Sequence, residues 1–216
     1  MDVSFLITTF NNGKFLKKSI DSCLNQKNHN ISFEIVIIDD GSTDGTQYIL
    51  SKYKNDKIKT FRIPNSGIER AINFSFSKAR GKFFVRLDAD DYLDKHFLNL
   101  TQKHLSNHHF IYTNYNLVNK SGHLIREVKL PKFDIAEIVE RGDFMASGTI
   151  YPKQFIETFG GYETNHKNCG LENYEFVLKL IFNDIKGFLV PKTIVNYRRH
   201  DKNMSVEKIN AIIKYG

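Results

Sequence analysis

The sequence predicts an α/β protein in which a mostly parallel central sheet carries helices on both faces. In the first half of the chain, short runs of apolar, β-branched and aromatic residues alternate with stretches whose apolar residues recur at helical spacing. This alternation is typical of a parallel sheet, because each helix returns the chain to the edge where the next strand begins. The second half is less regular and indicates a smaller region of mixed strands.

The first half contains four expected strands, and the first two are apolar runs typical of strands covered on both faces. The four strands are Val3–Thr9, Phe33–Ile38, Ile58–Ile63 and Lys82–Leu87. Four helices with an apolar stripe alternate with them: Lys14–Asn25, Asp44–Lys54, a helix that starts after Ser66-Gly67, and one that starts after Asp94. We expect Ser42 or Thr43 to cap the second helix and Asp94 to cap the fourth.

The second half is expected to contain a hairpin, further short strands and three helices. The strands are Phe110–Val118, His123–Val128 after a turn at 119–122, Gly148–Tyr151, Phe188–Val190 and Ile194–Tyr197. The helices are Ile135–Arg141, Leu171–Phe182 and Val206–Tyr215. No low-complexity linker divides the chain, so we expect a single domain over 1–216 with two halves, 1–107 and 108–216.

Composition narrows the classes of protein that fit. The 216 residues are 41% hydrophobic and 25% charged, as in a folded chain. The net charge is +7, but Lys and Arg are spread out and no zinc-finger or stacking-aromatic motif occurs, so we expect no nucleic-acid partner. Two cysteines cannot form a disulfide scaffold, and neither a transmembrane segment nor a secretion signal is expected. We therefore expect a cytoplasmic protein, and peripheral contact with an anionic membrane stays open.

Polar clusters follow each of the four strands of the first half, at 8–11, 39–42, 64–67 and 88–91. The carboxyl ends of parallel strands share one edge of the sheet, and ligands bind there. The last cluster, Asp88-Ala89-Asp90-Asp91, packs three carboxylates into four residues, and they repel one another unless a cation is bound. Such hard oxygen ligands suit Mg²⁺ or Mn²⁺. The alternative is a turn followed by a helix cap.

The segment 39–45 has its own alternative, an Asp-Gly turn followed by a helix cap. It lacks the Gly-x-Gly-x-x-Gly spacing of dinucleotide-binding proteins, and the chain contains no Gly-Lys-Ser/Thr triplet. The sequence therefore disfavours a dinucleotide-binding protein and a P-loop protein.

The order and spacing of these motifs resemble the family 2 glycosyltransferases, whose GT-A fold has a Rossmann-like sheet. The resemblance is carried by VSFLITTFNNGKFLKKSIDSCLNQ, FEIVIIDDGSTDGT and NSGIERAINFSFSKARGKFFVRLDADD, and returns at FGGYETN, GLENYEFVLKL and VNYRRHDKNMS. It implies a nucleotide-sugar-binding half at 1–107 and an acceptor-side half at 108–216. It further implies transfer of a sugar from a nucleotide-sugar, most often UDP-linked, to an acceptor hydroxyl, with inversion at the anomeric carbon.

The resemblance also implies a setting: Mn²⁺ or Mg²⁺ as cofactor, a saccharide or lipid-linked acceptor, and bacterial surface-polysaccharide synthesis at the inner face of the cell membrane. A divalent cation and an arginine would stabilise the leaving diphosphate. A carboxylate would take the proton of the acceptor hydroxyl.

Carried over by position, the resemblance assigns nucleotide-sugar contacts to Thr8, Phe10, Asn11, Asp40, Arg70, Asp88, Ala89 and Arg198. The first three would line the base site, Asp40 would contact the base or ribose, and Asp88 the ribose or sugar. Asp90 and His200 would hold the metal against the diphosphate. For Arg198 and His200 the alternative is an ordinary strand end at the surface.

The chain departs from the family pattern at the expected catalytic base. Family members usually carry Glu-Asp where this chain has Glu172-Asn173, and the Asp is the usual base. An amide cannot accept a proton at neutral pH. Glu172 is the nearest substitute and Glu175 lies one helical turn further on, although both also fit the polar face of a helix. The sequence therefore leaves three alternatives open: an enzyme with Glu172 as base, an enzyme with an unusual acceptor, or a catalytically impaired nucleotide-sugar-binding protein.

Tyr162, in Phe159-Gly160-Gly161-Tyr162, could stack on a sugar ring, and the alternative is a tight turn with aromatic packing.

A nucleotidyltransferase also uses metal-bound carboxylates, but it would usually show a glycine-rich basic loop near the N-terminus. The segment 8–18 has one glycine, which disfavours that class.

Overall fold

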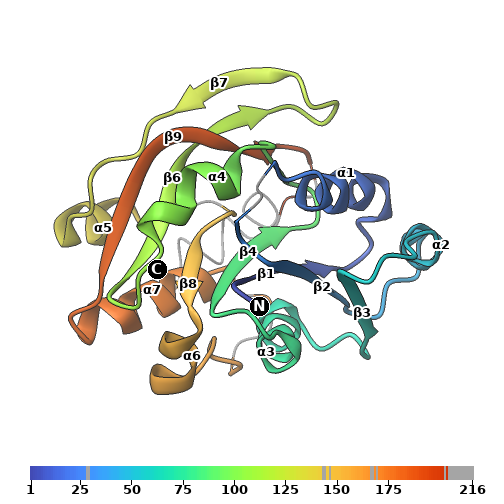
Figure 1. Cartoon of the computed structure of the whole chain (residues 1–216), viewed down its shortest axis with the longest axis horizontal. Helices are drawn as coiled ribbons and strands as arrows, with labels where there is room; N and C mark the ends of the chain where they lie inside the picture. The colour runs from blue at the N-terminus through green and yellow to red at the C-terminus, as the bar shows by residue number, and fades with distance from the viewer. Residues whose placement is uncertain are drawn as a thin grey trace.

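A nine-stranded sheet runs through the part of the chain that the structure describes (Figure 1). The computed structural model describes residues 1–27, 30–142, 145, 147–165, 168, 170–201 and 203. The strands are β1 (Val3–Thr9), β2 (Phe33–Asp39), β3 (Ile58–Arg62), β4 (Phe83–Asp88), β5 (Tyr92–Leu93), β6 (His109–Val118), β7 (Leu124–Val128), β8 (Ile150–Pro152) and β9 (Lys186–Arg198). The helices are α1 (Gly13–Leu24), α2 (Thr46–Ser51), α3 (Ile68–Lys78), α4 (Phe97–Thr101), α5 (Ile135–Arg141), α6 (Lys153–Phe159) and α7 (Glu172–Phe182), with a 3₁₀ turn at Gln102–His104.

The first four strands are parallel neighbours in the order β3-β2-β1-β4, which confirms the expected parallel sheet. The order continues as β8-β6-β9-β5, with antiparallel pairs on both sides of β8 and a parallel β6–β9 pair. Strand β7 pairs with β6 outside this order. The register sets Thr9 opposite Asp39 and Thr8 opposite Asp88. The carboxyl end of β1 therefore lies between two acidic strand ends.

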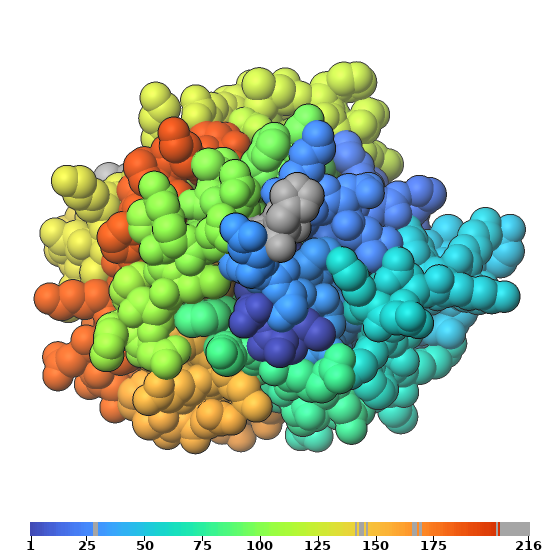
Figure 2. All heavy atoms as spheres, viewed as in Figure 1, coloured from blue at the N-terminus to red at the C-terminus, as the bar shows by residue number. Residues whose placement is uncertain are grey.

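Side chains of the central strands alternate between two cores. Phe5 packs with Leu16 of α1 and Phe97 of α4, whereas Leu6 packs with Ile72 of α3 and Phe176 of α7. Figure 1 shows α1 and α4 on one side of the sheet and α3, α6 and α7 on the other. In the space-filling view, the N-terminal residues lie in the middle of the visible face (Figure 2). Burial of apolar surface on both faces fixes the sheet and leaves its carboxyl edge to polar residues.

One long strand, β9, replaces the two short strands expected at Phe188–Val190 and Ile194–Tyr197. Strand β6 pairs with it in parallel on both sides of Pro191. The register jumps from Thr113 opposite Val190 to Asn114 opposite Thr193, so an irregularity accommodates the two residues between them. The proline therefore interrupts the ladder locally without ending the strand.

The expected caps also differ in detail. Helix α2 begins at Thr46, and the Asp44 carboxylate, not Ser42 or Thr43, accepts the Thr46 N–H at 2.9 Å. Asp94 accepts the His96 N–H at 2.8 Å, one residue before α4 begins at Phe97. The Ser42 hydroxyl instead accepts a hydrogen bond from the Asn11 N–H. The expected helix Val206–Tyr215 lies outside the described residues.

Candidate active site

An acidic loop, defined here as residues 88–91, connects β4 to β5 at the carboxyl edge of the parallel strands. The Asp91 N–H donates to the Asp88 carbonyl at 3.1 Å, which closes the loop into a tight turn. Ala89 is buried and packs in the core beneath it. The tight turn therefore holds three carboxylates close together at the end of β4.

The expected metal residues, Asp90 and His200, meet in the structure although 110 residues separate them. Asp90 Oδ2 lies 2.8 Å from Nε2 of His200 and accepts from Nδ2 of Asn203 at 3.2 Å. The imidazole packs on the Phe15 ring, with centroids 4.8 Å apart. Asn203 also accepts the His200 N–H through its side-chain oxygen. This corner thus joins the acidic loop, α1 and the segment that follows β9.

The other two carboxylates of the acidic loop have raised pKa values. Loss of hydration raises the pKa of Asp88; the nearby Arg86 charge opposes the shift, and the negative charge of Asp90 adds to it. Burial also raises the pKa of Asp91, and the charges of Asp90 and Asp88 add to the shift. Crowded carboxylates therefore resist ionisation in this loop, and a bound cation would relieve their repulsion.

Asp91 is a structural part of the loop that the sequence did not single out. Its side chain is buried, and Oδ1 accepts the backbone N–H of Arg198 at 2.7 Å. Its Oδ2 has no hydrogen-bond partner among the described residues. Asp91 therefore ties the end of β9 to the acidic loop.

Glu172, the expected base, begins α7 and is paired with a buried arginine of β4. Arg86 Nη2 donates to Glu172 Oε1 at 3.0 Å and to Asp88 Oδ1 at 3.4 Å. Glu172 is 4% exposed, and within the described ranges its Oε2 has no hydrogen-bond partner. The guanidinium thus holds one oxygen of Glu172, and the other oxygen is buried without a hydrogen bond among the described residues.

Asn173 accepts two hydroxyl hydrogen bonds, which is a role that an amide can fill. The hydroxyls of Tyr151 and Tyr162 both donate to its Oδ1, each at 3.1 Å. Tyr162 is 4% exposed; its ring is stacked with Phe76 at a centroid distance of 6.0 Å and is tilted against Phe176 at 5.0 Å. The Tyr162 ring is therefore packed in the core and is not accessible to a sugar in this structure, as the alternative of aromatic packing expected.

Asp40 organises the loop before α3. Its Oδ1 accepts from the Ser66 N–H at 2.7 Å and from the Ser66 hydroxyl at 3.0 Å, and its Oδ2 accepts the Gly67 N–H at 2.9 Å. Arg70 lies one turn further along this helix and is exposed. Asp40 thus sets the position of the helix that carries Arg70.

Thr8, Phe10 and Asn11 lie at the end of β1, beside Asp40. Thr8 is half-buried, and Phe10 is 46% exposed. Asn11 has a φ of 53°, donates its N–H to the Ser42 hydroxyl at 2.9 Å and accepts the Thr43 N–H at 2.8 Å. This left-handed turn joins the β1 and β2 loops and presents the Phe10 ring at the surface.

Arg198 is buried beside the acidic loop and bonded to backbone carbonyls. Its Nε donates to the Asp90 carbonyl at 2.8 Å, and its Nη1 to the Lys120 carbonyl at 2.8 Å. The guanidinium lies over the rings of Phe15 and Tyr92. The alternative for Arg198, an ordinary strand end at the surface, does not hold, because the residue is 3% exposed.

The protein donors alone do not make a complete metal site. Within the described ranges, no group of three or more His, Cys, Asp or Glu side chains is placed to hold a metal ion. Asp90 and His200 supply one carboxylate and one imidazole. Sites for Mg²⁺ commonly use one or two carboxylates and complete the shell with water and phosphate oxygens, and Mn²⁺ accepts both oxygen and nitrogen ligands. This donor set therefore fits a divalent cation that shares its shell with a diphosphate.

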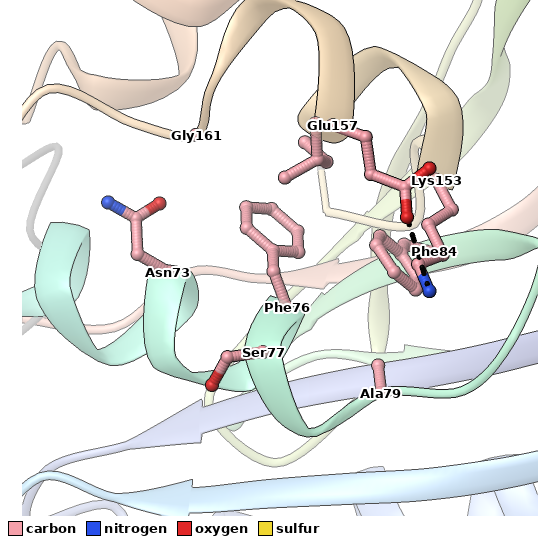
Figure 3. Close-up of a pocket in the computed structure, with 9 residues that line it drawn as sticks. Asn73, Phe76, Ser77, Ala79, Phe84, Lys153, Glu157 and Gly161 are labelled. Carbon is pink, nitrogen blue, oxygen red and sulfur yellow. Dashed lines mark ion pairs between the residues drawn. The ribbon is translucent and has the colours of Figure 1, made fainter.

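A cavity of about 390 Å³ lies elsewhere, between α3 and α6 (Figure 3). Phe76 and Phe84 form part of its lining, and Lys153 and Glu157 pair across 3.3 Å beside it. None of the residues expected in the site lines it. The hollow is thus separate from the acidic loop.

Sequence reasoning missed Arg86, Asp91 and Asn203 as members of the site. Arg86 carried a usable signal, since a charged residue inside an otherwise apolar strand needs a buried partner. Asp91 stood in the acidic cluster but received no role. Asn203 gave no signal, because only the folded chain brings it to Asp90.

A mostly parallel sheet with an acidic loop at its carboxyl edge is the arrangement of the GT-A fold. The structure of Staphylococcus aureus TarS 1-349 in complex with UDP-GlcNAc matches with a TM-score of 0.78 and 20% identity, over 98% of this chain and 64% of that chain. This likeness concerns the fold. The chain belongs to glycosyl transferase family 2, whose model matches residues 4–164.

Relatives by sequence are longer proteins. An uncharacterized glycosyltransferase of Rickettsia felis is 35% identical over 159 residues, which are 72% of this chain and 24% of that protein. Chondroitin synthase of Pasteurella multocida is 34% identical over 128 residues, 57% of this chain and 13% of that protein. The chain spans between 19% and 40% of the length of four rickettsial relatives. Among the described helices, none has the length and apolar character needed to cross a bilayer.

Proposed function

We propose that this chain is a metal-dependent inverting glycosyltransferase that moves a sugar from a UDP-sugar to a hydroxyl of a saccharide or lipid-linked acceptor. The observation that carries the proposal is the Asp90–His200 contact of 2.8 Å beside Asp88, at the edge where β1, β2 and β4 end. Solved structures of TarS hold UDP-GlcNAc and UDP, which supports a nucleotide-sugar donor. The chondroitin synthase relative supports bacterial polysaccharide synthesis as the setting, and we propose the cytoplasmic side of a membrane as its place.

The donor would occupy the carboxyl edge of the parallel strands. Exposed Phe10 offers a flat face for the base, and Asn11 and Asp40 frame the two loops beside it. Asp88 is half-buried at the end of β4 and would bind the ribose or sugar. Arg70 would lie at the outer side of the base, on the helix that Asp40 anchors.

Asp90 and His200 would hold a Mn²⁺ or Mg²⁺ ion. When bound, the ion supplies Lewis-acid stabilisation of the charge that develops on the leaving diphosphate. The protein holds its two donors ready: Asn203 fixes the Asp90 carboxylate, and Phe15 supports the imidazole. A bound cation would in turn favour ionisation of Asp88 and Asp91, which burial and crowding oppose.

Glu172 is the base that we propose. Arg86 holds its Oε1 at 3.0 Å, so Oε2 is the oxygen that would take the proton of the acceptor hydroxyl. The rival function is a nucleotide-sugar-binding protein without turnover. It is favoured by one observation, the Asn173 amide at the position of the usual base, held by two tyrosine hydroxyls.

The first experiment is a thermal-shift titration of the full chain with UDP, with Mn²⁺ and with both. We expect stabilisation by UDP that increases with Mn²⁺, and we expect Asp90→Asn to remove the Mn²⁺-dependent part. Asp56→Asn is the matched control, because this exposed carboxylate lies in the turn before β3. Identical shifts in wild type and Asp90→Asn would exclude Asp90 from the metal site.

A second experiment separates enzyme from binding protein. UDP release is measured with several UDP-sugars and saccharide acceptors in the presence of Mn²⁺. Turnover supports the transferase. Tight UDP-sugar binding without turnover for any donor and acceptor would favour the rival function.

A further inference from the structure

Arg198 is a buried cation at the place where three segments of the chain meet. It is 3% exposed, and its guanidinium carbon lies 4.8 Å from the ring centroid of Phe15 and 5.3 Å from that of Tyr92. Within the described ranges no carboxylate forms an ion pair with it. Its charge is therefore balanced by aromatic faces and by carbonyl oxygens.

The hydrogen bonds of Arg198 connect the acidic loop to the β6–β7 turn, which we define as residues 119–122. Nε donates to the Asp90 carbonyl at 2.8 Å, while Nη1 donates to the carbonyls of Lys120 at 2.8 Å and Asn119 at 3.4 Å. The backbone N–H of Arg198 donates to Asp91 Oδ1 at 2.7 Å. One residue thus contacts two positions of the acidic loop and two of the turn.

The turn is also seated from its other side. The Tyr92 hydroxyl donates to the Gly122 carbonyl at 3.4 Å, and the Lys18 ammonium lies 3.6 Å from the centroid of the Tyr92 ring. Gly122 has a φ of +90°, a conformation that glycine adopts without strain. The turn therefore rests on Arg198, Tyr92 and α1 together, and it joins the second half of the chain to the acidic loop.

Two of the three guanidinium nitrogens of Arg198 are committed to the fold. Nε and Nη1 point at the carbonyl oxygens of Asp90, Asn119 and Lys120, and no rotamer change can move these backbone groups aside. Removing the guanidinium would take this side-chain donor away from the Asp90 and Lys120 carbonyls. The geometry thus suits a group that holds the loop in place.

We propose that Arg198 is a positioning residue that fixes the acidic loop to the β6–β7 turn. Through the Asp90 carbonyl it sets the direction in which the Asp90 carboxylate meets His200. The inference rests on the proposed function for the role of Asp90 as metal ligand. Its consequence is that Arg198 acts on the metal-dependent part of nucleotide binding alone.

The test compares wild type, Arg198→Met and Arg199→Met in the full chain, by calorimetric titration with UDP in EDTA and in Mn²⁺. In Arg198→Met we expect the affinity for UDP in EDTA to stay within twofold, and the gain in affinity on adding Mn²⁺ to fall at least tenfold. Arg199 is the matched control, because it is the adjacent and exposed arginine, and both values should stay at wild type. A loss of UDP affinity in EDTA with an unchanged gain from Mn²⁺ would overturn the proposal and make Arg198 a phosphate ligand.

A second measurement is independent of the nucleotide. Hydrogen exchange, followed by mass spectrometry, should rise at least tenfold in peptides from both 88–93 and 118–123 in Arg198→Met, and in neither for Arg199→Met. Unchanged exchange in either peptide would contradict the tether. If Arg198→Met does not fold, Arg198→Lys replaces it, since one ammonium group cannot span both carbonyls. If wild type binds no UDP with Mn²⁺, the proposed function fails, and the exchange experiment still decides the tether.

Discussion

Arg86 shows how a single buried side chain sets the chemistry of its neighbours. Burial alone would lower the pKa of Arg86, but the negative charges of Asp88 and Glu172 outweigh this effect. The net pKa lies above its ordinary value, so Arg86 stays protonated. It bonds both carboxylates at once, from the strand that leads into the acidic loop. Its cation also lies 5.7 Å from the centroid of the Tyr162 ring. Arg86 therefore links the proposed base to the acidic loop.

The base can be assigned by two substitutions in adjacent residues. We expect Glu172→Gln to lower the rate of UDP release about 10²-fold or more, because general-base catalysis contributes on that order. We expect Asn173→Asp to stay within about threefold of wild type, since the new carboxylate would accept the same hydroxyls of Tyr151 and Tyr162. Steady-state kinetics with a saturating donor measures both rates. A hundredfold gain in Asn173→Asp, with little loss in Glu172→Gln, would move the base to position 173.

The residues of this site differ in how far the sequence could predict them. Asp88, Asp90 and the polar ends of β1 and β2 follow from strand order, because parallel strands bring their carboxyl ends together. The contact of His200 with Asp90 could be proposed only from a family resemblance, as no local spacing links residues 110 positions apart. The carbonyl contacts of Arg198 could not be predicted, because backbone acceptors leave no mark in a sequence.

At the scale of elements, Glu34 binds three strands of the parallel sheet together. It is 1% exposed in β2, accepts from the Ser4 hydroxyl of β1 at 2.9 Å, and pairs with Lys59 of β3 at 3.3 Å. Arg80, in the connection from α3 to β4, donates its backbone N–H at 2.6 Å and its Nε at 3.0 Å. Burial opposes ionisation of Glu34, but the hydrogen bonds from Arg80, Ser4 and Lys59 outweigh it and lower the pKa.

The lowered pKa of Glu34 predicts a stability that depends on pH. The ionised form stabilises the fold fully above the ordinary carboxyl value of 4.5, and this contribution is lost as the pH falls through the lower pKa of the folded state. We expect Glu34→Gln to reduce the free energy of unfolding by about 2 kcal/mol at pH 7, since bonds to a charged group are lost. The difference from wild type should shrink below pH 4.5. Urea unfolding at pH 7, 5 and 3 measures it, and a difference that is constant over this range would contradict the assigned charge.

Elements were predicted best where one physical signal dominates. The four parallel strands and α1 and α3 follow from hydrophobic periodicity, because burial on two sheet faces leaves few other patterns. Two short strands were predicted where β9 is continuous, because the pairing of β9 with β6 accommodates Pro191 through a register shift that the sequence does not show. Strand β5, two residues long, has no periodicity to find and forms because β9 passes beside it.

On the scale of the whole molecule, the two halves share one sheet. Strand β8 lies between β4 of the first half and β6 of the second, and pairs with both. The Arg86–Glu172 pair and the Arg198 tether cross the same boundary at the carboxyl edge. A site built from both halves keeps its geometry only while both are folded, so we infer that the chain behaves as a single domain.

This inference predicts that the halves unfold together. Native-state hydrogen exchange at increasing urea should give the slow amides of β1 and β2 the same free energy of opening as those of β6 and β9, within about 1 kcal/mol, because a sheet that is continuous through β8 opens as one cooperative unit. Arg86→Met is the comparison variant, because it removes the buried ion pair with Glu172 and leaves that carboxylate without its partner. In this variant we expect the amides of α7 to exchange at a lower urea concentration than those of β1. If instead the wild-type strands β6 and β9 exchanged several kcal/mol more easily than β1 and β2, the halves would be separate folding units. The pairing of β8 with β4 would then be a weak contact, and the site would form by docking of two folded halves.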